Sequence, residues 1–199
     1  MKIIFAIAVS ILFYCSNLHA QSWSELGAGS NALNANQAIG TICLDPAGNV
    51  YAAGEFWDTT GRLYVAKWNG TSWSELGPGL APGYFSDEIQ ILCSDSAGNI
   101  YAGGEFKDDS GYCYVAKWNG SSWSEVGTGS SALNANCNIL SISFDKNGYL
   151  YTAGCFVNTS GHTYVAKWDG TSWSEVGSGS GALNGNGAIN TIFIDTNGL

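Results

Sequence analysis

The phrase YVAKWNGTSWSELG occupies residues 64–77, and it decides the fold because it returns twice with little change. It reads YVAKWNGSSWSEVG at 114–127 and YVAKWDGTSWSEVG at 164–177, so the period is 50 residues. A partial copy, SWSELG, stands at 22–27. Catalytic motifs seldom recur at a fixed period, whereas stacked structural units do. The chain is therefore expected to repeat one supersecondary unit.

Each period reads as four short strands joined by turns. In the first copy, apolar or alternating segments predict strands at 38–44, 50–56, 63–68 and 71–76. The segment DPAGN separates the first two strands, and an Asp at the start of such a turn is expected to cap its own backbone rather than bind calcium.

The Asn-Gly step at Asn69 predicts the register of the last hairpin. Both residues accept the positive φ of a type I′ turn, which favours a two-residue loop and places Ala66 opposite Trp73. Lys67 then lies on the opposite sheet face from Glu75, because side chains alternate along a strand. We expect each lysine of this kind to reach a glutamate or a tryptophan ring of the neighbouring sheet, or to extend its ammonium group into water.

One face of this hairpin is broad and aromatic, so each sheet is expected to lie between copies of itself. Four antiparallel strands in every period, covered on both faces, favour an all-β protein with the architecture of a β-propeller. An open β-solenoid is the alternative, although its coils are usually shorter and parallel. Burial between blades is predicted for the tryptophans at one repeat position, Trp73, Trp123 and Trp173.

The complete blades are predicted at approximately 38–77, 88–127 and 138–177. Segments 22–26 and 189–195 would then be an orphan fourth strand and an orphan first strand. Three complete blades and two partial ones form an incomplete ring, so we expect the sequence to be a portion of a longer propeller.

The repeat resembles that of known propellers. The glycine pair of YAGGEF (101–106), followed by Val115, Trp118 and Trp123, resembles the kelch repeat. The phrase AKWNGTSWSELG is also similar to the AxWDGxxW repeats of secreted bacterial propellers and of a fungal cortical-marker propeller. This resemblance implies a kelch-like secreted β-propeller. The pattern departs from kelch at Ala53, where the glycine pair is broken.

The first twenty residues have the layout of a secretory signal peptide. Lys2 is followed by the apolar run IIFAIAVSILFYC, and small Ala20 ends the segment. The apolar run is too short to span a membrane. We expect cleavage after Ala20, a protein that is secreted or displayed on the cell surface, and no membrane-spanning segment.

A net charge of −9 disfavours nucleic acid as a partner, because an acidic surface repels phosphates. Cofactor binding, metal binding and catalysis are not predicted, since neither a GxSxG nor an HExxH motif occurs. Five cysteines follow the leader, and most are expected to be small buried residues rather than a disulfide framework: Cys43, Cys93, Cys113, Cys137 and Cys155.

The long, variable segments of the repeat are predicted to gather at one rim of the propeller. Loops between second and third strands share this rim with the blade connections, and binding residues concentrate on variable loops. Its aromatic and acidic side chains are the predicted ligand-binding residues: Trp57, Asp58, Tyr84, Asp87, Asp108, Asp109 and Tyr112.

Aromatic rings beside carboxylates suit a glycan, which stacks on the rings and donates hydroxyl hydrogen bonds, or a cationic protein segment. The sequence therefore predicts a secreted or cell-surface binding module for a glycan or protein ligand. Two alternatives stay open: these side chains merely cover the blade edges, or the propeller is the non-catalytic part of a larger secreted enzyme.

Overall fold

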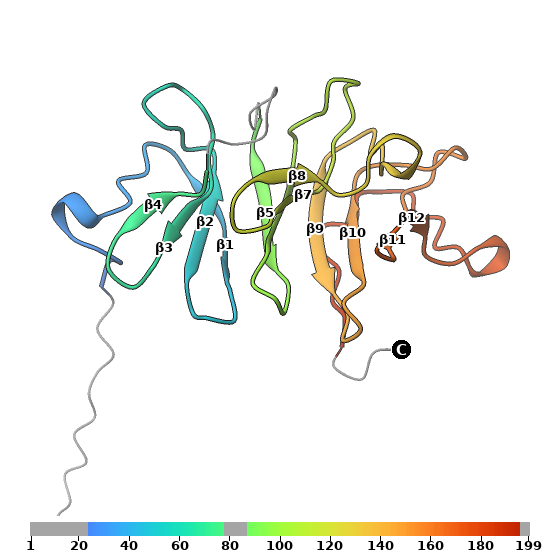
Figure 1. The fold of residues 1–199 in the computed structure, drawn as a ribbon. Helices are drawn as coiled ribbons and strands as arrows, with labels where there is room; N and C mark the ends of the chain where they lie inside the picture. Colours follow the sequence, from blue (N-terminus) through green and yellow to red (C-terminus); the bar gives the residue numbers. More distant parts are fainter. Residues whose placement is uncertain (1–23, 78–86, 196–199) are drawn as a thin grey trace, which may run out of the picture.

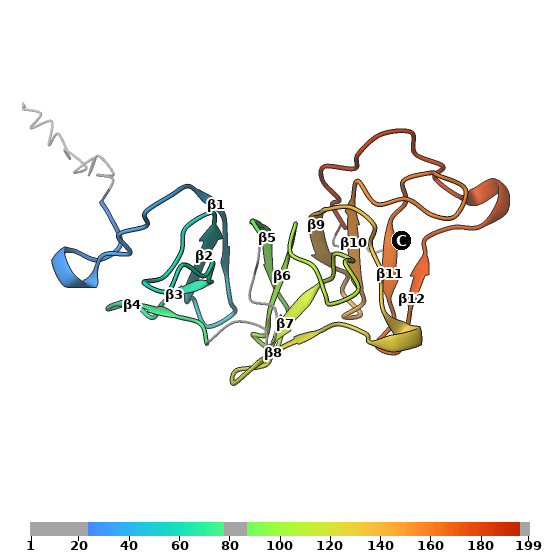
Figure 2. The ribbon, with the colours of Figure 1, turned by 90° about the horizontal axis from the view of Figure 1, so that it is seen from above.

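The structure is a computed structural model that describes residues 24–77 and 87–195 (Figure 1). The predicted signal peptide and Tyr84 lie outside the described residues. Within them, twelve strands form three separate four-stranded antiparallel sheets, and each sheet keeps its strands in chain order. These are three blades of a β-propeller whose ring is not closed (Figures 1 and 2).

The blades follow one another along the chain at the predicted period. Blade 1 consists of β1 (Ile39–Leu44), β2 (Val50–Gly54), β3 (Ala66–Trp68) and β4 (Trp73–Glu75). Blade 2 consists of β5 (Ile89–Ser94), β6 (Ile100–Gly104), β7 (Ala116–Trp118) and β8 (Trp123–Glu125). Blade 3 consists of β9 (Ile139–Phe144), β10 (Leu150–Gly154), β11 (Ala166–Trp168) and β12 (Trp173–Glu175). The 3₁₀ turns η1 (Gly29–Asn31), η2 (Gly129–Ser131) and η3 (Gly179–Gly181) lie outside the sheets.

The turn between the first two strands of each blade is organised by its aspartate, as predicted. Asp45 Oδ1 accepts hydrogen bonds from the backbone N–H groups of Ala47 and Asn49, both at 2.9 Å. The hydroxyl of Tyr51 donates to Asp45 Oδ2 at 2.9 Å. Asp95 and Asp145 make equivalent turns in blades 2 and 3. These carboxylates hold their own turns.

The predicted register of the last hairpin is wrong. Trp68 pairs with Trp73, and Ala66 pairs with Glu75, so the loop contains four residues rather than two. The side chain of Asn69 explains the longer loop, because its Oδ1 accepts the N–H groups of Thr71 at 2.9 Å and Ser72 at 3.0 Å. An Asx turn therefore replaces the type I′ turn.

The register error spans two residues, so it leaves the predicted sheet faces unchanged. Lys67 still lies on the opposite face from Glu75. It does not reach a tryptophan or glutamate of a neighbouring blade, however. Its Nζ lies 5.6 Å from the ring centroid of Tyr51, its cross-strand partner in the same blade. Lys117 lies over Tyr101 in the same way. Lys167 Nζ lies 5.6 Å from the ring centroid of Tyr151 and closer, at 3.7 Å, to that of Tyr149.

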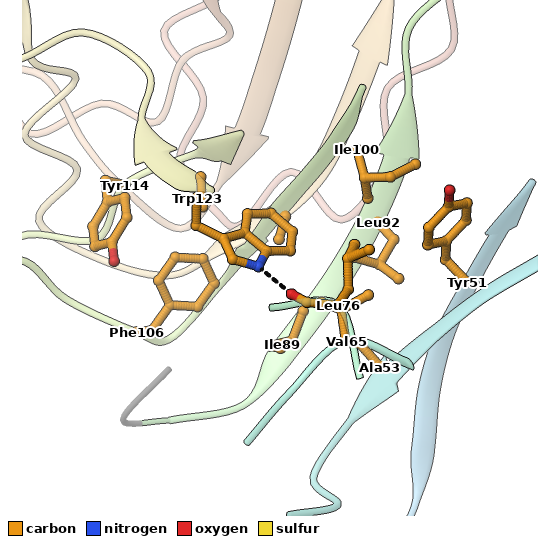
Figure 3. Close-up of a cluster of buried hydrophobic side chains, with 12 residues drawn as sticks. Tyr51, Ala53, Val65, Leu76, Ile89, Leu92, Ile100, Phe106, Tyr114 and Trp123 are labelled. Atoms are coloured by element: carbon orange, nitrogen blue, oxygen red, sulfur yellow. Dashed lines mark hydrogen bonds between the residues drawn. The ribbon is translucent and has the colours of Figure 1, made fainter. Parts of the chain in front are cut away.

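Successive blades pack face to face through two buried clusters. Figure 3 shows the first, in which Val65 and Leu76 of blade 1 meet Leu92 and Trp123 of blade 2. The indole N–H of Trp123 donates a hydrogen bond of 2.8 Å to the carbonyl oxygen of Leu76 (Figure 3). A second cluster joins blades 2 and 3 around Tyr101, Val115 and Ile142, which are all buried.

Burial of the tryptophans is confirmed fully only for Trp123, which is 7% exposed. Trp73 and Trp173 are half-buried. On the face of blade 1 for which the described residues supply no preceding blade, Ile42 is 63% exposed, whereas its counterpart Leu92 is 4% exposed. Stacking of blades, and not the strand pattern alone, therefore determines which apolar side chains leave water.

Two of the cysteines are not free, which corrects part of the prediction. Cys137, just before β9, forms a disulfide with Cys155, just after β10, with the two Cα atoms 5.3 Å apart. Cys43, Cys93 and Cys113 are free; Cys113 is buried and the other two are half-buried. The bridge is found in blade 3, where both repeat positions carry cysteine.

The two predicted orphan strands are not assigned as strands within the described residues. Both segments nevertheless make the hydrogen bonds that the equivalent strands make in complete blades. The carbonyl of Leu26 accepts the indole N–H of Trp73 at 2.9 Å, as that of Leu76 does for Trp123. The N–H of Ile192 donates to Ser141 Oγ at 3.0 Å, as that of Leu92 does to Thr41 Oγ1. No helix in these residues has the length and apolarity needed to cross a membrane.

Candidate binding site

The loops that follow β2, β6 and β10 lie at the opposite end of the blades from the aspartate turns (Figure 1). Each loop closes through an isolated bridge between its ends, namely Trp57 with Leu63, Lys107 with Cys113, and Val157 with Thr163. The connection after blade 2 adds a further bridge, between Ala135 and Cys113. This rim is a set of hydrogen-bonded loops, and we call it the loop rim.

Two of the predicted binding carboxylates organise these loops. Asp58 Oδ1 accepts the N–H groups of Thr60 at 2.7 Å and Arg62 at 3.0 Å. Asp108 Oδ1 accepts the N–H groups of Ser110 and Tyr112, each at 2.9 Å. Asp58 and Asp108 therefore hold the shape of their own loops. In both residues these backbone groups bond to Oδ1 and not to Oδ2.

The two predicted aromatic residues that can be placed both face solvent. Trp57 is 43% exposed and Tyr112 is 40% exposed. Asn36 fixes the backbone at Trp57, since its Oδ1 accepts the Trp57 N–H at 3.0 Å and its Nδ2 donates to the Trp57 carbonyl at 3.1 Å. The two rings thus stand on hydrogen-bonded loops of neighbouring blades.

The remaining predicted residues cluster around the loop of blade 2. Asp109 and Asp87 are exposed. Burial raises the pKa of the Cys113 thiol, and the surrounding charges that act on it include those of Asp87 and Asp108. Burial raises the pKa of Tyr114, and the charges of Glu125, Asp108 and Asp109 raise it further. The structure therefore brings Asp87, Asp108 and Asp109 around one loop, while Trp57 and Asp58 belong to the next loop along the rim.

The sequence prediction missed the glutamate of the fourth strand as a rim residue. Burial and the charge of Asp108 raise the pKa of Glu125 to about 7. Glu75 shows the same direction, because burial and Asp58 raise its pKa more than Arg62 lowers it. The sequence did contain a signal for this glutamate, because the predicted hairpin placed Glu75 on the same sheet face as Tyr64. The two-residue register shift did not alter that face.

Blade 3 carries an amide where blades 1 and 2 carry the loop aspartate. Asn158 Nδ2 donates to both carboxylate oxygens of Glu175, at 3.1 and 3.3 Å. These two residues line a cavity of about 310 Å³ together with Tyr164 and Trp173. Each blade thus presents a tyrosine, a glutamate and a loop Asp or Asn at the loop rim, a set of hydrogen-bond acceptors beside aromatic surface.

Metal coordination finds no support in this part of the molecule. Within residues 24–77 and 87–195, no three His, Cys, Asp or Glu side chains come together closely enough to hold a metal ion. The acidic side chains of the loop rim instead accept hydrogen bonds from the protein or face solvent.

Comparison with known proteins identifies no family. Neither a known protein family nor a curated protein sequence matches the chain. Among solved structures, it is similar to a fucose lectin from Kordia zhangzhouensis in complex with methyl-fucoside, with a TM-score of 0.46 and 18% identity. The alignment covers 69% of this chain and 96% of the lectin. A likeness at this level assigns no ligand to the present chain.

Proposed function

We propose that this protein is an exported propeller module that binds a glycan at the loop rim. The observation that carries the proposal is the exposure of Trp57 and Tyr112 on loops fixed by hydrogen bonds. A large ring that is held rigidly in water offers a stacking surface for the apolar face of a sugar at little entropic cost.

Acidic acceptors beside these rings support a ligand rich in hydroxyl groups. Asp87 and Asp109 are exposed beside the Tyr112 loop, and Glu125 lies half-buried below it. A sugar hydroxyl donates to a carboxylate without adding charge, whereas an anionic ligand would be repelled by a chain of net charge −9. A cationic protein segment would satisfy the same carboxylates, and it is the competing outcome of the test.

Export is supported by two observations of different kinds. The leader has the layout of a secretory signal, and the Cys137–Cys155 disulfide is typical of proteins that fold in an oxidising compartment. We therefore place the module outside the cytosol, as a secreted or surface-displayed protein.

The test is binding of the full chain to an array of neutral glycans, acidic glycans and lysine-rich peptides. Trp57→Ala and Tyr112→Ala should each weaken glycan binding at least tenfold, whereas Tyr112→Phe should retain it because the ring remains. Retention of full glycan binding by both alanine variants would refute the loop rim as the site. Selective binding of the lysine-rich peptides would instead identify a protein-binding module.

A further inference from the structure

A second kind of concave site lies at the opposite rim, where the aspartate turns lie, and it occurs at both blade interfaces. The hollow between blades 1 and 2 has a volume of about 360 Å³, and the one between blades 2 and 3 about 540 Å³. Ligand-binding pockets commonly fall in this range of volumes. Neither hollow includes a loop-rim residue from the predicted binding set.

The two hollows are lined by the same repeat positions. In the larger one, blade 2 contributes Asp95, Tyr101 and Lys117, and blade 3 contributes Trp168. In the smaller one, the corresponding side chains are Asp45, Tyr51 and Lys67 of blade 1 and Trp118 of blade 2. Each hollow therefore forms only when two blades stack, because its lysine comes from one blade and its tryptophan from the next.

Glycines keep the hollows open. Gly148 and Gly170 line the larger hollow with φ of +82° and +99°, and a Cβ at either position would meet nothing within 4 Å. Gly98 and Gly120 do the same in the smaller hollow, with φ of +84° and +99°. Glycine adopts these left-handed conformations without a steric penalty. The glycines thus allow the left-handed backbone of these turns and, having no side chain, leave space beside the tryptophan.

The polar groups of the larger hollow are partly held and partly available. Tyr101 donates its hydroxyl proton to Asp95 Oδ2 at 3.1 Å, which fixes the orientation of both groups. Lys117 Nζ lies 5.3 Å from the centroid of the Tyr101 ring. No carboxylate in residues 24–77 and 87–195 forms a salt bridge with Lys117, so its three N–H donors can serve a ligand.

The indole of Trp168 supplies the apolar wall of this hollow. It is half-buried, with its six-membered ring packed over Gly127 of the preceding blade, where an added Cβ would lie 2.8 Å from Cζ3. Its neighbour Trp173 lies at a centroid distance of 5.6 Å and an angle of 49°, which braces the ring from the far strand. A braced indole beside open space is suited to stacking against a flat apolar face.

We propose that each of the two hollows binds one neutral pyranose unit, with its C–H face on the tryptophan and its hydroxyl groups bonded to the lysine and aspartate. The smaller hollow has one carboxylate and one ammonium group, whereas in the larger one Glu125 and Asp169 join Asp95 beside Lys117. Neither hollow carries an excess of positive charge, which disfavours a phosphate or a uronate as the ligand. The larger hollow shares Glu125 with the loop rim, but neither hollow includes Trp57 or Tyr112, the two rings on which the loop-rim proposal rests. The chain would then carry two equivalent sites that stack along the propeller.

The test uses methyl glycosides of neutral hexoses and 6-deoxyhexoses, added to the full chain at millimolar concentration. The readout is the indole N–H signals of Trp118 and Trp168 in ¹H–¹⁵N correlation spectra, which report on the two hollows separately. Binding should shift both signals. Lys117→Met should abolish the shift of Trp168 and leave that of Trp118, whereas Lys67→Met should have the opposite effect.

Two controls separate the hollows from general effects. Lys107→Met makes the same change at an exposed position that lines neither hollow, and it should leave both shifts intact. Gly148→Asn places a side chain in the larger hollow and should block it, whereas Gly161→Asn puts the same residue at a φ of +80° in a loop-rim turn and should not. Well-dispersed spectra confirm that each variant is folded.

The outcomes also separate this proposal from binding at the loop rim. If Trp57→Ala and Tyr112→Ala remove glycoside binding while the lysine variants retain it, the hollows are not sites. If neither indole signal shifts with any glycoside, the proposal is wrong whatever binds at the loop rim. Loss of the Trp168 response in Lys117→Met alone supports it, even where the array shows no loop-rim binding.

Discussion

The indole N–H of Trp123 donates a hydrogen bond of 2.8 Å to the carbonyl oxygen of Leu76, 47 residues earlier in the chain. Trp173 makes the same bond to Val126, and Trp73 makes it to Leu26. The fourth strand of each blade is thus fastened to the fourth strand of the blade before it, or to the segment that takes its place. The bond recurs once per repeat and always joins one blade to the segment before it, so it is a regular feature of the blade interface.

Replacement of Trp123 by alanine should lower the free energy of unfolding by about 3–5 kcal/mol, because a large buried side chain is lost. Trp123→Phe should still cost about 1–3 kcal/mol, since the Leu76 carbonyl loses its partner between two blades. Trp73→Ala is the matched control and should cost less, as that side chain is only half-buried. Urea midpoints measure all three, and equal losses at Trp123 and Trp73 would contradict this account.

Gly77 should tolerate alanine poorly for two separate reasons. Its φ of +74° is left-handed, which costs an alanine about 1–2 kcal/mol. The added Cβ would also overlap the Trp118 ring of the next blade, which adds about 1–3 kcal/mol of overpacking. Gly48→Ala shares the positive φ, at +83°, but meets nothing within 4 Å. Thermal unfolding should therefore show a larger loss for Gly77→Ala; similar losses would mean that the ring gives way.

Glu125 should make the protein less stable as the solution becomes neutral. Its folded-state pKa of about 7 lies above the ordinary 4.5, so the folded protein holds a proton that the unfolded chain releases between these values. Stability then falls as pH rises through this window. Glu125→Gln should remove the fall, and its advantage over the parent should grow from about pH 5 to about pH 8 in urea denaturation. An advantage that does not change with pH would exclude this titration as its cause.

Asp95 should show the opposite pH dependence. Burial alone would raise its pKa, but hydrogen bonds from Asn99, Tyr101 and Ala97 outweigh burial and lower it below 3.8. Its contribution to stability is therefore present above that value and is lost as pH falls through the depressed folded-state pKa. Asp95→Asn should be less stable than the parent at neutral pH, and the difference should shrink in acid. Asp109→Asn, in an exposed loop position, should change stability by less than about 0.5 kcal/mol.

Most of the fold follows from the repeat, and so does part of the candidate site. The 50-residue period and the alternation of side chains predicted three four-stranded blades, and the turn aspartates behave as their sequence context indicated. The hairpin register was mispredicted because Asn69 supports both a type I′ turn and a four-residue Asx loop, and the sequence does not rank them. Glu125 was missed because burial beside Asp108 depends on the loop folding over the outer strands.

What the sequence determined by itself is local and periodic: where each strand lies, which side chains share a face, and that the unit is repeated. The tertiary structure decided what happens between units. Lys117 packs on Tyr101 rather than on a neighbouring blade, and the hollow beside it takes its tryptophan, Trp168, from the next blade. The physical reason is that side-chain alternation and turn chemistry act within a few residues, whereas burial and concave surface arise only when two blades stack.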